Sequence, residues 1–256
     1  MNLDFEKALT YIAKDPGWSN KILAGGGLLL ATFAIFIIPV FLLILTTSGV
    51  IGLTSFILCF VFSIILSLVL AGYMAQTSNK RINYQNSLLP DWSEFGRFII
   101  TGLKYFVGYF LYTIPLILLT SVFAGLVITA VHGCPDCGLL NTMFFILITL
   151  IGALTLFVYI LYIVFCPLMM ACFFSDLKIL SFVDFKKAFD MLKNNVGNYC
   201  ILILLFIAIS MLGQLLCSIL MITIVGIIFI PIVYFYIYLV IAELCAQFVL
   251  SARDKE

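Results

Sequence analysis

Long apolar stretches separated by short polar segments form the dominant pattern of this chain. One polar segment, DFKKAFDMLKNNVGNY at residues 184–199, spaces its apolar side chains in steps of three, one, three, four and three. This spacing places the apolar side chains on one face of a helix and most charged side chains on the other. Because a long apolar run follows at once, the pattern predicts an amphipathic helix on a membrane surface, before the chain enters the bilayer.

The surface-helix pattern opens with an acid, a Phe, any residue and a base, and this opening occurs three times. The copies begin 90 residues apart and read Asp4-Phe5-Glu6-Lys7, Glu94-Phe95-Gly96-Arg97 and Asp184-Phe185-Lys186-Lys187. Each copy precedes a long apolar stretch. We therefore expect one membrane domain over residues 1–256, made of three parallel repeats at about 1–90, 91–180 and 181–256. Each repeat would consist of an amphipathic surface helix followed by a transmembrane hairpin.

The apolar runs predict six transmembrane helices in an all-α integral membrane protein, since a helix of roughly 20 residues spans a bilayer. The predicted surface helix at about 3–14 precedes the first span. The six expected spans are residues 22–45, 51–75, 102–131, 141 onwards, 200–222 and 227–250. The polar stretch 76–90 is expected to link the first two units. Pro115 predicts a kink. The fourth run has no charge until Asp176, so we expect tilt, a break near Pro167 or an interfacial tail.

Composition agrees with a membrane protein. Hydrophobic residues make up 64% of the chain, charged residues 10%, and the mean hydropathy is +1.26. A soluble domain has roughly 45–50% apolar and about 25% charged residues. The net charge of +1 gives no reason to expect a nucleic-acid partner. The charged, amphipathic first 22 residues do not resemble a signal peptide, so we expect no cleavable signal.

The distribution of basic residues predicts the orientation in the membrane. All 13 Lys and Arg residues fall in or beside the N-terminus, the connections between spans two and three and between spans four and five, or the C-terminus. None falls in the turns after spans one, three and five. Because Lys and Arg near the ends of spans stay in the cytosol, both termini are expected to be cytosolic.

Short motifs, most of them in the first half of the chain, suggest a family. They are DPGW at 15–18, KILAGG at 21–26, GYM at 72–74, LPDWSEFGRF at 89–98 and GLK at 102–104. With these motifs the chain resembles an uncharacterised prokaryotic integral-membrane family, domain of unknown function 4013. The second half is similar in layout but weaker in motif. The resemblance implies a multi-pass protein of the bacterial or archaeal cytoplasmic (inner) membrane. It implies no activity and no catalytic residue.

The best-defined candidate for chemistry is the loop Cys134-Pro135-Asp136-Cys137, which is expected on the exoplasmic side. This pair could be a disulfide that tightens the turn, a redox pair or half of a metal site. The sequence offers no second CxxC motif, and His132 is the only histidine, so no metal site and no cofactor are expected. The chain also lacks a P-loop, an HExxH helix and a nucleophile elbow, and so has no catalytic signature.

Glu243 is the one acid well inside an expected span. An ionised carboxylate at mid-bilayer costs at least about 2.5 kcal/mol on insertion scales, so it either marks a pathway or pairs with another group. The carboxylate could pair with a lysine of a surface helix, or it could reach a water-filled cavity. Gln247 and Gln214 could form a polar site with Glu243, although interhelical hydrogen bonding by these two and Gln76 is the simpler interpretation.

The basic side chains of the surface helices could bind anionic lipid headgroups, each contributing about 1 kcal/mol near the surface. They are Lys7, Lys14, Arg97, Lys186, Lys187 and Lys193. Snorkelling that orients the helices is the alternative interpretation. It is favoured because neighbouring acids dilute the positive charge.

Three functions are compatible with these patterns. The hairpins could enclose a cavity that binds or translocates a lipid or a small amphiphilic solute. The chain could instead be a non-catalytic scaffold or subunit that meets a membrane-protein partner or a second copy of itself. It could also be an exoplasmic thiol redox protein acting through Cys134 and Cys137. A cavity between the hairpins would favour the first function, and a stoichiometric partner without a cavity would favour the second.

Overall fold

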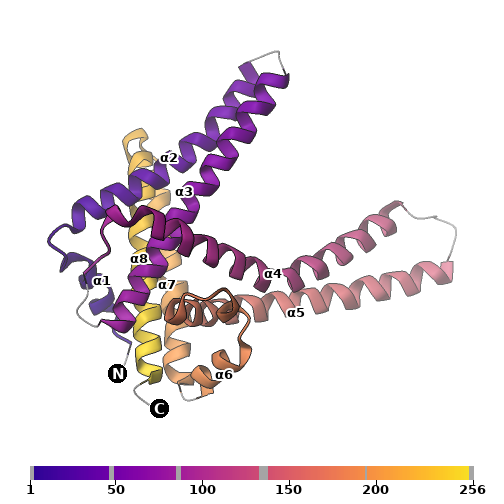
Figure 1. Cartoon of the computed structure of the whole chain (residues 1–256). Coiled ribbons are helices and arrows are strands. Elements are labelled where there is room, and N and C mark those ends of the chain that lie inside the picture. Colours follow the sequence, from indigo (N-terminus) through magenta and orange to yellow (C-terminus); the bar gives the residue numbers. More distant parts are fainter. Residues whose placement is uncertain (1–2, 46–48, 85–87, 133–137, 194, 254–256) are drawn as a thin grey trace.

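The computed structural model describes residues 3–45, 49–84, 88–132, 138–193 and 195–253, and all regular structure in these ranges is helical. The elements are α1 (Phe5–Ala13), α2 (Trp18–Leu45), α3 (Gly49–Asn83), η1 (Trp92–Glu94), α4 (Phe95–His132), α5 (Gly138–Asp176), η2 (Ile179–Phe182), α6 (Phe185–Lys193), α7 (Val196–Leu220) and α8 (Ile224–Arg253). Figure 1 shows the long helices arranged as three hairpins, α2/α3, α4/α5 and α7/α8.

Within the described ranges, five helices are long and apolar enough to cross a membrane. They cover Leu53–Asn83, Trp92–Ala130, Thr142–Asp176, Val196–Leu220 and Val225–Arg253. The protein is therefore a membrane protein whose described part is helical throughout its regular structure, as the hydrophobic pattern predicts. α2 is a further helix of 28 residues that pairs with α3.

The helices pack tightly at one end of the molecule and separate towards the other (Figure 1). We call the packed end the base; its centre consists of residues 66–82 of α3, 168–176 of α5 and 235–252 of α8, which contain most of the buried side chains. The separated ends of the hairpins are the arms, whose apolar side chains are largely exposed, as at Leu58 (72%) and Leu150 (63%). Such surfaces suit contact with lipid.

The base exists because several helices are longer than a bilayer requires. α3 has 35 residues and α5 has 39, which correspond to about 52 and 58 Å of helix, against a hydrocarbon thickness of about 30 Å. Both termini and the short helices α1 and α6 lie at the same end as these extensions (Figure 1). The polar ends of the helices therefore pack on one another rather than on lipid.

Glycines allow the backbones of α3 and α4 to touch in the base. A Cβ atom added at Gly72 would lie 1.8 Å from the carbonyl oxygen of Phe98, and one added at Gly102 would lie 1.8 Å from that of Leu68. Small residues at helix crossings are a common device for close packing in membranes. At the contact between α2 and α8, a Cβ atom added at Gly25 of α2 would enter the ring of Phe235 on α8.

One expected boundary was wrong. The stretch 76–90, expected to be a linker, is helical as far as Asn83, because residues 76–82 are mostly buried against other helices and are not exposed to solvent. Of the three alternatives for the fourth apolar run, a break at Pro167 does not occur, because helix α5 continues through this residue. Helix α4, which contains Pro115, is bent (Figure 1).

The surface helix expected over residues 184–199 is divided into two helices. α6 ends at Lys193, and Val196 and Tyr199 belong to α7. Tyr199 turns inward, where its ring packs on Phe248 with centroids 5.7 Å apart and its hydroxyl donates to the carbonyl of Val164. This inward packing requires a change of helix direction, which the spacing of apolar residues does not reveal.

The first and third units begin alike. α1 and α6 both have nine residues. In each, the acid before the helix caps it: Asp4 Oδ1 accepts from the Lys7 amide, and Asp184 Oδ1 accepts from the Lys187 amide, both at 3.0 Å. Glu94 of the second unit instead lies in η1 and accepts from Arg97 Nη1 at 3.0 Å. The middle unit thus departs from the other two, and the threefold repeat stays a prediction.

Candidate functional site

A central cavity of about 360 Å³ lies between the hairpins, within the base. Each of the six long helices contributes to its wall. The lining residues are Leu29, Ser67, Leu70, Ala71, Met74, Tyr105, Met170, Phe206, Tyr238 and Ile241. The volume lies within the range of ligand sites in proteins, about 300–1,000 Å³. The wall is predominantly apolar, with three hydroxyl-bearing residues, Ser67, Tyr105 and Tyr238.

One face of α3 supplies the largest share of this wall. Ser67, Leu70, Ala71 and Met74 follow the spacing of three, one and three that aligns side chains on a helix face. Ser67 and Ala71 are small, and this leaves space opposite the larger side chains of the other helices. This stripe is the signal by which sequence analysis could have found the cavity.

Packed aromatic rings occupy the base beside the cavity. The ring of Tyr105 lies 5.5 Å from Phe173, 6.2 Å from Phe174 and 5.2 Å from Phe182, measured between ring centroids. The three Phe side chains are fully buried. The cavity is therefore bounded on this side by close-packed side chains.

A buried ion pair joins α3 to α8 in the base. Arg81 Nε donates to Glu243 Oε1 at 3.0 Å and to Oε2 at 3.1 Å, and the Glu243 side chain is 0% exposed. Gln247 Nε2 donates to Glu243 Oε1 at 3.2 Å, while Gln247 Oε1 accepts from the Asp4 amide at 2.9 Å. Because a lone buried charge is very costly, this network keeps the carboxylate paired and hydrogen-bonded.

Helix α1 covers the ion pair. The Arg81 guanidinium lies 5.0 Å from the centroid of the Tyr11 ring, a cation–π contact. The Tyr236 hydroxyl on α8 donates to the Leu9 carbonyl at 3.0 Å. The partner of Glu243 is thus Arg81 at the end of α3, which was neither of the two alternatives, a surface-helix lysine or a water-filled cavity. Sequence analysis missed Arg81 because it placed this residue in a linker.

A second polar cluster fastens the segment before α4 to the start of α2. Lys21 Nζ lies 2.8 Å from Asp15 Oδ2, 2.9 Å from Asp91 Oδ1 and 2.8 Å from the Leu89 carbonyl. The Leu89 amide in turn donates to Asp15 Oδ2 at 3.0 Å. We call these residues the Lys21 clamp.

The ionic contacts of the clamp shift its pKa values in opposite directions. Burial opposes the charged form of Lys21, but the hydrogen bonds that Lys21 donates to Asp15 and Asp91 outweigh it and raise the pKa of Lys21 above 10.5. The hydrogen bond from Lys21 lowers the pKa of the Asp91 carboxyl below 3.8. Both groups are therefore charged throughout the neutral range.

Aromatic contacts extend the clamp into the base. The Tyr73 hydroxyl donates to the Pro90 carbonyl at 2.9 Å, and its ring stacks on Trp92 with centroids 4.3 Å apart. Trp92 Nε1 donates to the Lys21 carbonyl at 3.2 Å. The short motifs noted in the sequence, from DPGW to LPDW, thus meet at one place. Their shared role here is to join α2, α3 and the start of α4.

A family model for proteins of unknown function, DUF4013, matches residues 55–222. The chain belongs to the DUF4013 family. No curated protein and no solved structure matches the chain. In this DUF4013 protein the matched region runs from α3 into the end of α7. It includes Arg81, the α3 wall of the cavity and the LPDW motif, whereas Glu243 lies beyond it.

The remaining candidate residues do not assemble into one site. Gln76 Nε2 donates to Thr101 Oγ1 at 3.0 Å and so bridges α3 and α4. Gln214 lies far from Glu243 along the α7/α8 hairpin and accepts a long, 3.5 Å bond from Tyr234. Cys134 and Cys137 lie outside the described residues. No group of three or more metal-ligating side chains occurs in the part of the chain that the structure describes.

The basic residues of the surface segments have different environments. Lys14, Lys186 and Lys193 are exposed, and Lys7 is half-buried. Arg97 pairs with Glu94, and Lys187 pairs with Asp176. Binding of anionic headgroups by these six side chains stays a prediction.

Proposed function

We propose that this DUF4013 protein binds a lipid or another small amphiphile in the central cavity. The single observation that carries the proposal is that all six long helices line this one cavity. A ligand there contacts all three hairpins and holds their arms together, so that its presence is coupled to their relative position. Translocation of the ligand along the arms is the extension of this binding role.

The apolar environment of the membrane limits which ligands the cavity can select. An acyl chain gains little by moving from lipid to an apolar wall, because both surroundings are equally apolar. Selectivity must then come from shape and from hydrogen bonds. The hydroxyl-bearing residues of the wall are Ser67, whose hydroxyl donates to the Ser63 carbonyl and can accept from a ligand, and Tyr105 and Tyr238, and they favour an amphiphile with a hydrogen-bonding group close to its apolar part.

The proposed arrangement in the membrane has six spans, with α2 as the sixth, in three parallel repeats. Both termini face the cytosol of a prokaryote, across the cytoplasmic membrane. The distribution of charge supports this orientation, because the Lys and Arg residues of the described ranges lie in the base, the short helices and the connections, and none in the arms. Single cysteines introduced at Lys80 and Lys187 test it. Both should react with a membrane-impermeant reagent only from the cytosolic side, and labelling from opposite sides would contradict it.

A photoactivatable phospholipid tests the binding proposal. The purified chain in lipid nanodiscs should be cross-linked within α3 or α8 at the cavity wall, and Ser67→Trp should reduce this labelling by filling the cavity. Ser121→Trp is the matched control. Both serines are exposed and donate to the carbonyl four residues earlier, at 2.8 and 2.7 Å, but Ser121 does not line the cavity.

The same experiment separates binding from a scaffold role. Equal labelling of both variants, confined to the outer faces of the arms, would overturn the proposal. Co-purification of a stoichiometric membrane partner, together with that result, would favour the scaffold.

A further inference from the structure

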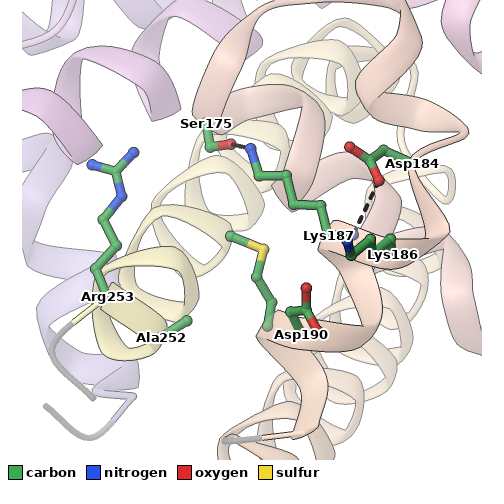
Figure 2. Close-up of a pocket in the computed structure, with 8 residues that line it drawn as sticks. Ser175, Asp184, Lys186, Lys187, Asp190, Ala252 and Arg253 are labelled. Carbon is green, nitrogen blue, oxygen red and sulfur yellow. Dashed lines mark hydrogen bonds between the residues drawn. The ribbon is translucent and has the colours of Figure 1, made fainter. Parts of the chain in front are cut away.

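A second cavity, of about 290 Å³, lies in the base between α6 and the C-terminal end of α8 (Figure 2). Its lining residues are Ser175, Asp184, Lys186, Lys187, Asp190, Met191, Ala252 and Arg253. Figure 2 shows Ala252 and Arg253 on the α8 side and Asp190 and Lys187 on the α6 side. Charges of both signs thus face one cavity, in contrast to the apolar central cavity.

Some of these charges already have partners. Lys187 Nζ contacts the Asp176 carboxylate and donates to Ser175 Oγ at 2.7 Å. Lys186, Asp190 and Arg253, by contrast, form no ion pair with any other residue in the described ranges. Lys186 precedes Asp190 by four residues, which is the less favourable order for an ion pair along a helix.

The charges around this cavity balance. The lining contains three cations, and there are three carboxylates once Asp176, the partner of Lys187, is counted with Asp184 and Asp190. An anion alone would meet nearby carboxylates that repel it. A ligand that carries one positive and one negative group matches both kinds of unpaired side chain.

The chemistry of the lining residues restricts the class of ligand further. A guanidinium and an ammonium, as in Arg253 and Lys186, bind phosphate oxygens well. The carboxylate of Asp190 can accept hydrogen bonds from a primary ammonium, whereas a quaternary ammonium has no N–H to donate. Quaternary ammonium groups are bound by aromatic rings, and the eight lining residues include no aromatic side chain.

We propose that this cavity binds a phosphoethanolamine-type zwitterion, with the phosphate on Arg253 and the primary ammonium on Asp190. Its source is either the headgroup of a membrane aminophospholipid or a free solute. The site is independent of the central cavity. Ile241 and Ala252, which line the two cavities on α8, are about 16 Å apart along the helix, and the fully buried Phe248 lies between them.

The test uses the purified full chain and native mass spectrometry with three lipids: phosphatidylethanolamine, phosphatidylcholine and phosphatidylglycerol. Phosphatidylethanolamine should be retained best, and Arg253→Gln and Asp190→Asn should each weaken its retention about fivefold, which corresponds to the loss of an exposed charged contact. Lys14→Gln is the control, because Lys14 is an exposed cation outside this cavity. All three side chains are exposed, so these variants should fold.

A competition arm with soluble phosphoethanolamine identifies the source. Displacement of the lipid by millimolar phosphoethanolamine would indicate that the headgroup chemistry is sufficient and that a free solute can occupy the site. Lack of displacement, with lipid selectivity intact, would assign the site to the membrane lipid. Preference for phosphatidylglycerol, stronger binding after Asp190→Asn, or equal retention of all three lipids would overturn the proposal. None of these results depends on the cross-linking at Ser67.

Discussion

Replacing Glu243 by Gln should destabilise the protein severely, because it removes the charge that pairs Arg81 in the base. The substitution keeps the size of the side chain and an oxygen that can accept from Gln247. What it removes is the ionic contact of 3.0 Å between Arg81 Nε and Glu243 Oε1, where the carboxylate is fully buried. The Arg81 guanidinium would then be a buried cation with no counter-ion.

The magnitude follows from this burial. Removing one partner of a buried ion pair typically costs about 3–5 kcal/mol, since the remaining charge stays desolvated. That is a large part of a total stability of about 5–15 kcal/mol. Replacing both partners, as in Arg81→Met with Glu243→Leu, should return most of the loss, because an apolar pair carries no desolvation penalty.

The chain supplies its own control for this prediction. Arg97 and Glu94 also lie 3.0 Å apart, but Arg97 is 63% exposed and Glu94 is 38% exposed. Glu94→Gln should therefore change the free energy of unfolding by no more than about 1 kcal/mol. Unfolding can be followed in mixed detergent micelles by the fluorescence of Trp92, which stacks on Tyr73.

Two results would refute the reasoning. If Glu243→Gln unfolds at the same detergent composition as Glu94→Gln, the carboxyl group is neutral or solvated and the pair is not ionic. If the double variant is no more stable than the single variant, the loss arises from altered packing and not from an unpaired charge.

Two further predictions concern the packing and the clamp. Gly72→Ala should destabilise the protein strongly in a thermal unfolding assay, because its Cβ would lie 1.8 Å from a backbone oxygen of α4. Gly96→Ala is the control: a Cβ added there has nothing within 4 Å, so this variant should be neutral or slightly stabilising. The folded-state pKa of Asp91 is lowered, so its stabilising contribution is present above its ordinary pKa of 3.8 and is lost as the pH falls through the lower, folded value. Since the pKa of Lys21 is raised, its contribution is complete below its ordinary pKa of 10.5 and is lost as the pH rises through the higher, folded value. The unfolding midpoint should therefore fall as the pH is lowered in the acidic range, and this fall should be smaller in Asp91→Asn than in the original protein. An equal fall in both would contradict the role of the clamp.

The sequence by itself determined the class of the protein and much of its layout. Apolar runs of about 20 residues or more can be satisfied in lipid only as helices, because every backbone polar group must find its partner within the segment. The hairpins and the short helices that precede the first and third of them also followed from local pattern. The family followed from short motifs whose residues turned out to meet around Lys21 and Tyr73.

The sites depended on the tertiary structure. Glu243 could be recognised as unusual from its place in an apolar run, but its partner lies 162 positions earlier in the chain, in a stretch that looks like a polar linker. The central cavity needs one or more side chains from each of six helices. Local sequence fixes which face of each helix is apolar, whereas the crossing of the helices decides which faces meet and where space remains between them. That crossing is set by contacts between residues far apart in the chain, such as Gly72 with Phe98 and Gly25 with Phe235.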